Sequence, residues 1–447
     1  MTTPITPPAQ GPKGRRFTGH LREFGRDRLG FLTGLARDYG DVVPFRLGHR
    51  RAWLVSHPDL IEEALVAKNK SMHKHFALRY FKGLIGLGLL TNEGDSWRRQ
   101  RRLIQPSFAP QRLLEYAQTM LELSSEMLAK WQPGQSRDIH RDISHLTMSI
   151  AARTLFEADP SKDAEEVSTV LREALLETNR RFGSLILLPD WIPTPGNRRL
   201  RASTARLNAV LSRLIDQRRQ SGTEGKDLLS HLFASVHEDD GTRMNDRQLR
   251  DEIMTLFLAG HGTTANALSW AWYLLATHPE AARKVYDEVD AVLDGGPVTV
   301  EKMHRLRYVD AVVNEGMRLY PPAYIIGREA TEDVELGGHA FRKGDTLFFS
   351  QWVVQRDARW FADPEVFRPE RWLDGSLKGM PKYAYFPFGG GPRVCIGNNF
   401  ARIEFPIILA SIAKAFRFTV DADQVVTPWA AVTLRPENGI RATLTAR

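Results

Sequence analysis

The sequence predicts an α+β fold that is mainly α-helical with smaller β-sheets. Three observations carry this prediction. A proline-free run covers residues 245–278, further helical segments bounded by proline or glycine follow it, and two stretches alternate apolar and polar residues around glycine turns. Long periodic segments are typical of helices, and short alternating segments are typical of half-buried strands. We therefore expect helices to form most of the core.

Besides the helices, the sequence predicts a loose lead-in and two hairpins. Residues 1–16 are rich in proline, threonine and glycine, and we expect them to form a loose lead-in. Apolar and polar residues roughly alternate over 42–56 on either side of a glycine turn, which predicts a hairpin. A second hairpin is predicted at 333–350, with turns at the glycine pair 337–338 and near 343–344.

The clearest predicted helix begins at Asn245. Gln248 stands three residues later, which is the spacing of a capping box, and no proline interrupts the chain before Pro279. At 1.5 Å per residue this helix is on the order of 50 Å long, enough to cross a whole domain. Residues 253–275 are apolar on nearly every face, so we expect this helix to be buried at the centre of the fold.

Two more helices are predicted directly after the central one. Pro279 opens the first, and the glycine pair 295–296 closes it. The second covers about 306–320 and stops at the proline pair 321–322. No internal repeat and no linker divides the chain.

Composition restricts the possible functions. Hydrophobic residues make up 42% and charged residues 26% of the chain, which is a globular balance. The 61 Lys and Arg exceed the 53 Asp and Glu, giving a net charge of +8, with local concentrations at 97–102 and 198–201. Neither cluster has interleaved aromatic residues or a binding module around it, so nucleic-acid binding is not expected.

The chain contains one cysteine, Cys395, which excludes an intramolecular disulfide. With no secretory signal in the sequence, we expect a protein of the reducing cytoplasm. No stretch approaches the roughly 18 apolar residues needed to span a bilayer, so a transmembrane anchor is not expected.

The most specific segment is 386–397, which contains three consecutive glycines, a proline and Cys395. Such a backbone can approach a flat ligand closely. A helical pattern from Ala401 onward places Cys395 just before a helix N-terminus, where the helix dipole favours a thiolate. For a lone cysteine the alternative is a buried, inert thiol on a glycine-rich turn.

This segment resembles the heme-binding loop of the cytochrome P-450 family. The fixed positions of the family pattern are filled by Phe388, Gly391, Arg393, Cys395 and Gly397. The resemblance implies the cytochrome P-450 fold, with a long central helix over the heme, and heme b (iron protoporphyrin IX) as cofactor. It also implies that Cys395 is the axial thiolate ligand and that Arg393 pairs with a heme propionate.

A second element supports the resemblance. Glu315 and Arg318 are three residues apart, which places them on one face of a helix, although most such pairs are solvated surface charges. The later segment 367–372 resembles the family segment that supplies a second arginine, here Arg371. The resemblance implies a buried structural network of these three residues, in which they are not catalysts.

Residues 259–264 lie in the middle of the predicted central helix and include Gly260 and Gly262. An interior glycine destabilises a helix by roughly 1 kcal/mol relative to alanine, so two of them need a reason. Close packing against a neighbouring helix is one such reason. The other is that a ligand lies against the backbone from Ala259 onward, while Thr263 loosens the local hydrogen bonding and binds oxygen or water. By resemblance, Thr263 occupies the position of the oxygen-activating threonine.

The sequence departs from the family pattern at Gly262, where an aspartate or glutamate is usual. That acid delivers protons during oxygen activation, a general-acid role that glycine cannot fill. Three interpretations stay open. Thr263 with ordered water suffices, His261 contributes, or the oxidation is poorly coupled and favours peroxide as oxidant.

The resemblance implies further propionate contacts from Trp97, Arg101 and Arg328, although each alone is equally compatible with a surface role. Other arginines of the same predicted helix offer a docking face for an acidic electron-transfer protein. These are Arg98, Arg99 and Arg102. A solvated basic helix is the alternative.

The resemblance covers nearly the whole sequence and implies one heme domain over 1–447. About fifty residues follow Cys395, so we expect electrons from a separate ferredoxin or flavodoxin with its reductase. The implied activity is that of a monomeric monooxygenase that uses O₂ to hydroxylate or otherwise oxidise a hydrophobic small molecule, such as a fatty acid, terpenoid or steroid. The alternatives are a peroxide-driven peroxygenase and a non-catalytic heme-binding or sensor protein.

The substrate pocket is expected between the central helix and four other segments. These are 73–90, 180–191, 323–326 and 428–434. The apolar residues 185–188 offer an entrance for a long apolar substrate, and a core or membrane-touching loop is equally compatible with them.

Overall fold

The computed structural model describes residues 9–156, 192–221, 227–235 and 243–447, together with residues 170, 173, 177 and 241. Residues 9–14 have no regular structure, as predicted, and Arg15 forms a β-bridge with Gly19. The first eight residues of the predicted lead-in, and the segment 180–191, lie outside the described residues.

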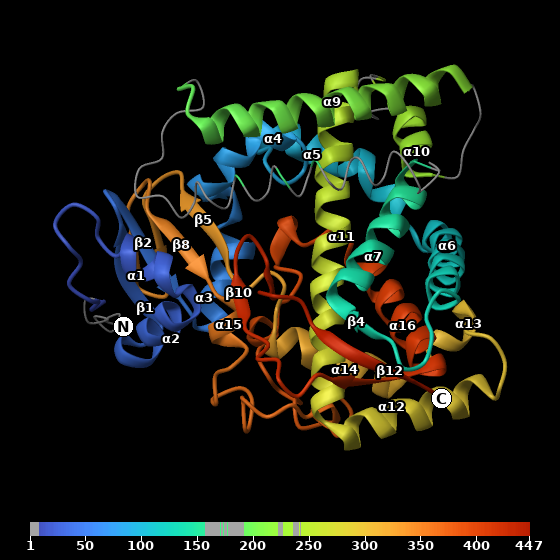
Figure 1. The fold of residues 1–447 in the computed structure, drawn as a ribbon. Helices are drawn as coiled ribbons and strands as arrows, with labels where there is room; N and C mark the ends of the chain where they lie inside the picture. The colour runs from blue at the N-terminus through green and yellow to red at the C-terminus, as the bar shows by residue number, and fades with distance from the viewer. Residues whose placement is uncertain are drawn as a thin grey trace.

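Helix α11 (Asp246–Thr277) runs through the middle of the molecule (Figure 1). The predicted capping box is present. The Gln248 N–H donates to the Asn245 side chain at 2.9 Å, and the Asn245 N–H donates to the Gln248 side chain at 3.1 Å. The prediction of burial on nearly every face was wrong for residues 258–263, which keep accessible surface because a cavity runs along them.

The other long helices surround α11. They are α5 (Gly94–Ile104), α6 (Pro110–Leu128), α7 (Ile139–Phe156), α9 (Pro195–Ser221), α12 (Pro279–Leu293), α14 (Arg307–Leu319) and α16 (Asn398–Ala415). Helix α9 crosses one end of α11 and α12 lies at the other end, while α7, α14 and α16 contact it along its length (Figure 1). The helices predicted at 279–294 and 306–320 are confirmed as α12 and α14.

Shorter helical segments connect these elements. They are α1 (Leu21–Arg26), α2 (Arg28–Tyr39), α3 (Pro58–Glu62), α4 (Lys82–Ile85), α10 (Leu228–Ala234), α13 (Val300–Met303) and α15 (Gln351–Val354), with a π-helical turn at Glu63–Ala67 and 3₁₀ turns at Asn69–Ser71, Phe76–Phe81, Gln105–Phe108, Pro369–Trp372, Lys382–Ala384 and Gly391–Arg393.

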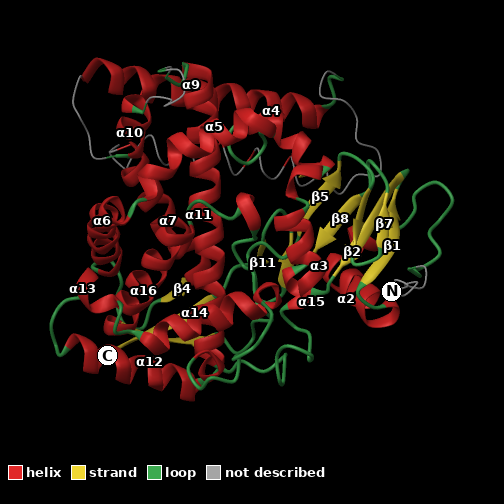
Figure 2. Ribbon diagram, turned by 180° about the vertical axis from the view of Figure 1, so that it is seen from behind, coloured by secondary structure: helices red, strands yellow, loops and turns green. Residues whose placement is uncertain are grey.

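The largest sheet lies beside the helical part of the molecule (Figure 2). Its strand order is β1 (Val42–Leu47), β2 (Arg50–Val55), β8 (Thr346–Phe349), β5 (Ile326–Ala330) and β3 (Met72–Lys74). The predicted hairpin at 42–56 is confirmed as the antiparallel pair β1–β2.

The prediction of a hairpin at 333–350 is confirmed only for its first half. Strands β6 (Val334–Leu336) and β7 (His339–Phe341) pair around the glycine turn, but β8 leaves them and pairs with β2 and β5. The physical reason is burial. All four residues of β8 are buried, so this strand needs partners and cover on every side, which only the inside of the larger sheet provides.

Two small sheets complete the β structure. One contains β4 (Ser136–Asp138), β12 (Arg441–Ala446) and β9 (Phe416–Val420), and the other pairs β10 (Pro428–Ala430) with β11 (Leu434–Pro436).

The core divides at the middle of α11. One cluster of buried apolar side chains includes Trp272 and packs the second half of α11 against α6, α7, α12, α14 and α16. Another includes Phe257 and packs the first half against α5, α9 and α10. Between them lies the stretch 258–264, which lines the cavity. The α+β class with a long central helix is confirmed.

Candidate functional site

A cavity of about 1490 Å³ extends along the middle of α11. It exceeds the roughly 300–1,000 Å³ of common small-molecule pockets. Its wall includes residues 258–264 of α11, 387–389 and 393–397 of the cysteine loop, and 326–328 of β5. The cavity therefore has room for a large flat group and a second molecule between α11 and the cysteine loop.

Cys395 lies two residues before Gly397, the N-cap of α16, as the sequence predicted. Its N–H donates to the Phe388 carbonyl at 3.0 Å, and the residue keeps accessible surface where it lines the cavity. Burial raises the pKa of the thiol, against the opposing effects of the Gly397 N–H, Arg101 and Lys74. The sequence had suggested that the helix N-terminus stabilises a thiolate at Cys395. In the structure the helix terminus does not by itself have this effect, because burial raises the pKa of the thiol. Coordination to a metal would deprotonate the thiol outright.

At two glycines of the loop the structure adds a second reason for glycine to the predicted one. A Cβ on Gly391, whose φ is +64°, would lie 1.9 Å from the Leu65 carbonyl oxygen, and a Cβ on Gly390 would lie 2.2 Å from the Tyr383 ring. Both positions are closed by protein atoms. Glycine is required here by the packing of the loop against its neighbours, and not only by the approach of a flat ligand.

Three cationic side chains, those of Lys74, Arg328 and Arg393, line the same cavity. Burial and the charges of Arg328 and Arg393 lower the pKa of Lys74 to about 7. Burial, with the charge of Arg393, lowers the pKa of Arg328 to about 10, and burial lowers that of Arg393 to about 10. Glu93 is the carboxylate that opposes all three shifts. An excess of positive charge remains, which suits a ligand carrying a pair of carboxylates.

Arg393 reaches from the loop toward α5, and Arg101 reaches from α5 to the loop. Arg393 donates to the Asn92 carbonyl at 2.9 Å, pairs with Glu93, and lies with its guanidinium carbon 3.9 Å from the centre of the Trp97 ring. Arg101 donates to the Val394 carbonyl at 2.8 Å, directly beside Cys395. The structure thus brings these predicted residues together around the loop, with Trp97 as a platform for Arg393.

The middle of α11 presents backbone and hydroxyl groups to the cavity. The Thr263 hydroxyl donates to the Ala259 carbonyl at 2.7 Å. Among the described residues, and apart from the chain neighbours and backbone of α11 itself, no heavy atom lies within 4 Å of a Cβ built on Gly260 or Gly262, so both glycines border open space. A ligand can therefore lie against this stretch of helix, as the sequence predicted.

His261 is satisfied within its own helix. Its Nδ1 lies 2.8 Å from the Phe257 carbonyl, and because a carbonyl only accepts, Nδ1 carries the proton. Burial lowers the pKa of His261, which keeps the ring neutral. The interpretation that His261 replaces the missing acid at position 262 finds no support in this geometry.

Glu315, Arg318 and Arg371 meet in the interior, as predicted. The two carboxylate oxygens of Glu315 accept from Arg318 at 2.9 and 2.8 Å, and one also accepts from Arg371 at 3.0 Å. The exposed fractions are 0%, 0% and 2%. Trp372 donates to the same carboxylate at 2.9 Å. The network joins α14 to the turn at 369–372.

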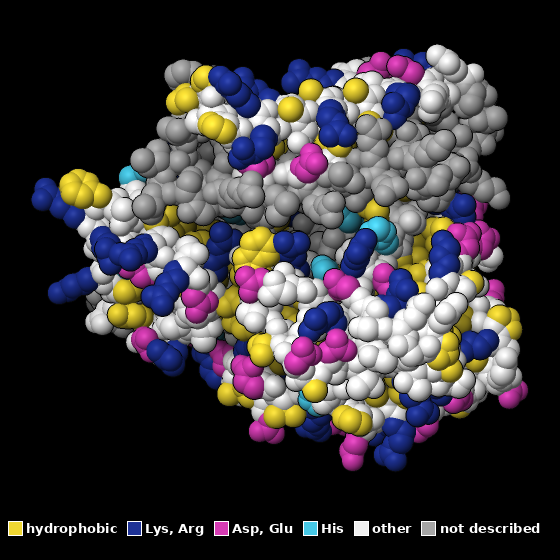
Figure 3. Space-filling model, viewed as in Figure 1, with side chains coloured by type: hydrophobic (Ala, Val, Ile, Leu, Met, Phe, Trp, Pro, Cys, Tyr) yellow, Lys and Arg dark blue, Asp and Glu magenta, His cyan; other side chains and the backbone are white. Residues whose placement is uncertain are grey.

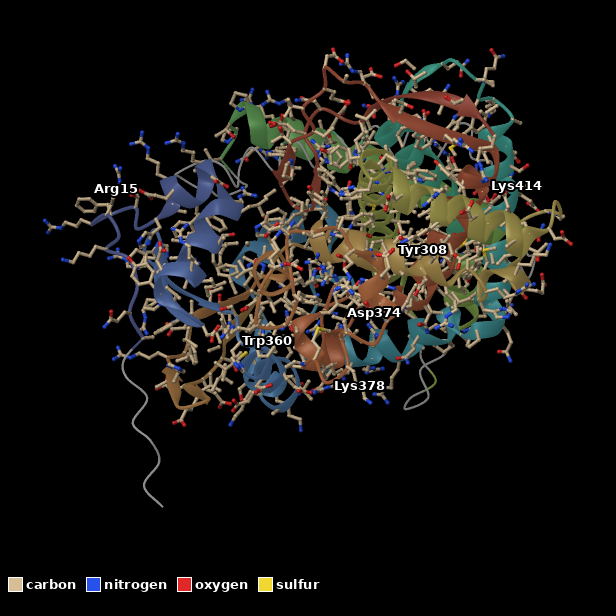
Figure 4. All side chains as sticks on the ribbon, turned by 90° about the horizontal axis from the view of Figure 1, so that it is seen from below. Arg15, Tyr308, Trp360, Asp374, Lys378 and Lys414 are labelled. Atoms are coloured by element: carbon tan, nitrogen blue, oxygen red, sulfur yellow. The ribbon has the colours of Figure 1, made fainter. Side chains whose placement is uncertain are left out.

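A second hydrogen bond links the two elements that carry this network. In Figure 4, Tyr308 on α14 and Asp374 just beyond the turn lie on this side of the molecule, where the two elements are in contact. The Tyr308 hydroxyl donates to Glu370 at 2.8 Å, a second link between the same elements.

The predicted pocket walls are confirmed in part. Residues 74–78, 81, 89–90, 323–326 and 431–433 line the cavity together with α11. The wall and entrance predicted at 180–191 lie outside the described residues.

The predicted docking arginines lie on α5. Arg98 and Arg102 are exposed and Arg99 is half-buried, and Arg98 donates to Asp95 at 3.1 Å. Away from α5, on the lower half of the face shown in Figure 3, basic and acidic side chains are mixed.

Sequence reasoning missed Lys74, Glu93 and Glu404. Lys74 and Glu93 flank the cationic end of the cavity but belong to no motif that could have marked them. Glu404 stands inside an apolar stretch of α16, and its carboxyl is 1% exposed. A carboxylate within such a stretch was the one signal available, because buried acids are rare unless partnered.

The residues present fit a heme. A cysteine opens into a cavity that is bordered by a stretch of helix with two glycines, and a cluster of cations that could pair with carboxylates lines the same cavity. Heme b carries two propionates, which would neutralise that cluster. The fold and the cavity together are those of a heme protein with room for a substrate.

Comparisons with known proteins give the family. Residues 9–441 match the family model described as Cytochrome P450. Cyclooctatin synthase of Streptomyces melanosporofaciens is 36% identical over 409 residues, which cover 91% of this chain and 89% of that protein. Cyclooctat-9-en-7-ol 5-monooxygenase of the same species is 34% identical, with 89% and 87% covered. Pentalenene oxygenase of Streptomyces avermitilis is 33% identical, with 96% and 95% covered.

The chain therefore belongs to the cytochrome P450 family. It is a monooxygenase with heme b as cofactor. Within the described residues, no helix combines the length and the apolar character needed to cross a membrane.

The buried network predicts a large loss of stability for Glu315→Gln. The substitution leaves the charges of Arg318 and Arg371 without a counter-charge in the interior, which should lower the free energy of unfolding by roughly 3–5 kcal/mol. Urea unfolding measures this. The control is Asp423→Asn, which removes an exposed partner of Arg441 and should cost about 1 kcal/mol or less. Equal losses in the two variants would contradict the role of the network.

The cationic cluster predicts pH-dependent heme affinity through Lys74. Below pH about 7 its amine is charged before heme binds, and its full attraction for a propionate contributes. Binding raises its pKa, so this contribution fades as the pH rises through the raised value. Hemin titration of the apoprotein should show that Lys74→Met weakens binding more below pH 7 than well above it. Lys82→Met, at an exposed residue of α4, is the control and should show no such dependence.

Proposed function

We propose that the protein hydroxylates a hydrophobic small molecule, with Cys395 as the ligand of the heme iron and α11 bordering the oxygen and substrate sites. The observation that carries this proposal is that Cys395 and the stretch Ala259–Thr264 line one cavity. A C–H bond of the substrate becomes C–OH and the second oxygen atom of O₂ leaves as water. Two electrons from a redox partner and two protons complete the balance.

Heme supplies the oxidising chemistry when it is bound, and the thiolate promotes O–O cleavage. The chain supplies position and charge. We assign Arg393, Arg328 and Lys74 to the propionates, with Trp97 supporting Arg393 and Arg101 fixing the loop at Val394. Phe388, Gly391 and Gly397 shape the loop.

Thr263 is assigned to oxygen binding. Its hydroxyl proton is engaged by the Ala259 carbonyl, so its lone pairs are free to accept a hydrogen bond. Gly260 and Gly262 keep the adjoining space open for oxygen and water.

We assign the substrate to the terpenoid class. Three relatives are named for acting on, or producing, pentalenene- and cyclooctatin-type compounds. Support within this chain comes from the apolar side chains around the cavity, among them Phe81, Leu89, Leu256 and Ile325. Fatty acids and steroids remain the other members of the test panel.

Electrons are assigned to a separate ferredoxin or flavodoxin with its reductase, docking near Arg98, Arg99 and Arg102. The extent of one domain over 1–447, the monomeric state and the cytoplasmic location stay predictions from the sequence. A second candidate, hydrogen peroxide as the direct oxidant, is favoured by one observation, the absence of an acid at Gly262.

The assignment of Cys395 as the ligand of the heme iron predicts a characteristic absorption spectrum. The reduced carbon monoxide complex should show a Soret band shifted strongly to the red, because a thiolate donates electron density to the iron. Cys395→Ser should lose this shift. A colourless purified protein, or an unshifted band in the wild type, would overturn the assignment.

Turnover assays identify the oxidant. They use a panel of lipophilic compounds that includes pentalenene. Product with ferredoxin and reductase supports the monooxygenase, and product with peroxide alone supports the second candidate. No product under either condition would count against both.

Gly262→Glu should increase the yield of product per electron pair consumed. The added side chain has open space, and a carboxylic acid beside Thr263 can deliver protons. Gly262→Gln is the matched control, since it fills the same volume without an acidic proton. An equal yield of product per electron pair in the two variants would mean that the site does not lack an acid.

A further inference from the structure

Two adjacent acids near the start of α11 bind the backbone of residues 86–93, which we call the wall segment. Asp251 accepts from the Leu87 N–H at 2.8 Å. Glu252 accepts from the Leu89 N–H at 2.9 Å. The two acids are 3% and 0% exposed. Leu89 and Leu90 line the cavity, and neither acid does. The acids therefore hold a part of the cavity wall from behind, through its backbone.

We propose that Asp251 and Glu252 determine which ligands fit the cavity, and which carbon of the substrate is oxidised, by fixing the position of the wall segment. The inference rests on the proposed function, because it concerns the substrate site of the same cavity. Neither acid lines that cavity, so both act as positioning residues and not as catalytic ones.

The wall segment packs closely against α11. A Cβ on Gly86, whose φ is +66°, would lie 2.0 Å from the Asp251 carboxylate. A Cβ on Gly88 would lie 2.2 Å from the Thr255 hydroxyl oxygen and 2.5 Å from the Asp251 carbonyl oxygen. Only glycine allows this approach. Because glycine has the most conformational freedom to lose, a segment with two glycines depends on hydrogen bonds from outside to keep one position.

The other end of the wall segment is fixed separately. Arg393 of the cysteine loop donates to the Asn92 carbonyl at 2.9 Å and pairs with Glu93. The Asn92 side chain donates to Gln100 of α5 at 2.8 Å. Leu89 and Leu90 therefore lie between two anchors, one on α11 and one at the cysteine loop and α5. Loss of the α11 anchor should move these two side chains while the second anchor stays.

A cation joins Asp251 to two further helices. Arg250 pairs with Asp251 and donates to the Asn208 side chain of α9. It also donates to the Leu84 carbonyl of α4 at 3.4 Å. Helices α4, α9 and α11 contact one another at the end of α11 that α9 crosses (Figure 1). The charge of Asp251 is thus compensated while its second oxygen accepts from the wall segment.

Glu252 offers a matched pair of variants. Burial raises the pKa of Glu252 to about 8, with the Leu89 N–H opposing the shift and the charge of Asp251 adding to it, so the carboxyl holds its proton at neutral pH. Glutamine has the same shape and presents a carbonyl oxygen, so Glu252→Gln keeps the acceptor for the Leu89 N–H. Glu252→Leu removes that acceptor and keeps the side chain large and uncharged.

The first test needs no turnover. Hydrogen–deuterium exchange of the ferric holoprotein at neutral pH, read by mass spectrometry, reports on a peptide that covers 86–91. Glu252→Leu should raise the exchange rate of this peptide by roughly 10-fold, because a buried hydrogen bond is lost, and Glu252→Gln should not. The control is Asp345→Ala, which removes a buried acceptor of Arg51 and Trp53 in the largest sheet and should leave the peptide unchanged. Equal exchange in the wild type and Glu252→Leu overturns the inference.

The second test measures selectivity by titrating the ferric holoprotein with imidazole and with 4-phenylimidazole. Both ligands bind heme iron through a ring nitrogen, but only 4-phenylimidazole adds an apolar ring that the wall can cover. Glu252→Leu should weaken 4-phenylimidazole relative to imidazole by roughly 10-fold, the effect of losing the burial of an apolar group. Glu252→Gln and Asp345→Ala should keep the wild-type ratio of dissociation constants. A wild-type ratio in Glu252→Leu overturns the inference.

The third test uses pentalenene as the turnover probe. Glu252→Leu should change the ratio of the oxidised positions, with a larger change in KM than in kcat. Gly88→Ala is a second route to the same change, because its Cβ pushes the wall segment away from α11 and leaves both acids in place. Glu252→Gln should keep the wild-type ratio. Wild-type positions in both Glu252→Leu and Gly88→Ala overturn the inference.

The two proposals fail separately. An unshifted carbon monoxide band in the wild type defeats the proposed function, while the exchange rates still decide whether the acids hold the wall segment. A normal carbon monoxide band in Glu252→Leu, together with wild-type exchange and a wild-type ratio of the two imidazoles, defeats the inference about the wall segment alone.

Discussion

The structure depends on how α11 is buried. A helix of 32 residues with apolar side chains around its circumference must be covered on all sides, and α7, α14 and α16 supply most of that cover. In the middle of this helix the stretch 258–263 is left open, because its glycines offer no side chain for a neighbouring helix to pack on. The gap between the two apolar clusters thereby becomes the cavity.

Burial also sets the electrostatics around this cavity. It raises the pKa of Cys395 and Glu404 and lowers that of Lys74, Arg328 and His261. Each of these shifts disfavours the charged form, as expected where water is removed. In the heme complex proposed above, the iron and the two propionates would reverse the effect for the thiol and the cations, and would thereby complete the charges of the pocket.

The interior contains two buried acids with different surroundings. Glu315 accepts from two guanidinium groups and an indole, so its charge is compensated in the core. Glu404 has one hydroxyl beside it and keeps its proton instead. Burial is equal for the two side chains. The difference lies in the hydrogen-bond donors that surround them.

The sequence by itself determined the helical class, the length and start of α11, the hairpin at 42–56 and the motif around Cys395, because each depends on neighbours a few residues apart. It could not place β8, which pairs with β2 and β5 from distant parts of the chain. Nor could it find Lys74, Glu93 or Glu404, since their environment comes from contacts across hundreds of residues. Tertiary structure alone decided why Gly390 and Gly391 must be glycine and what stands behind Thr264, because burial and hydrogen-bond supply are properties of the packed chain.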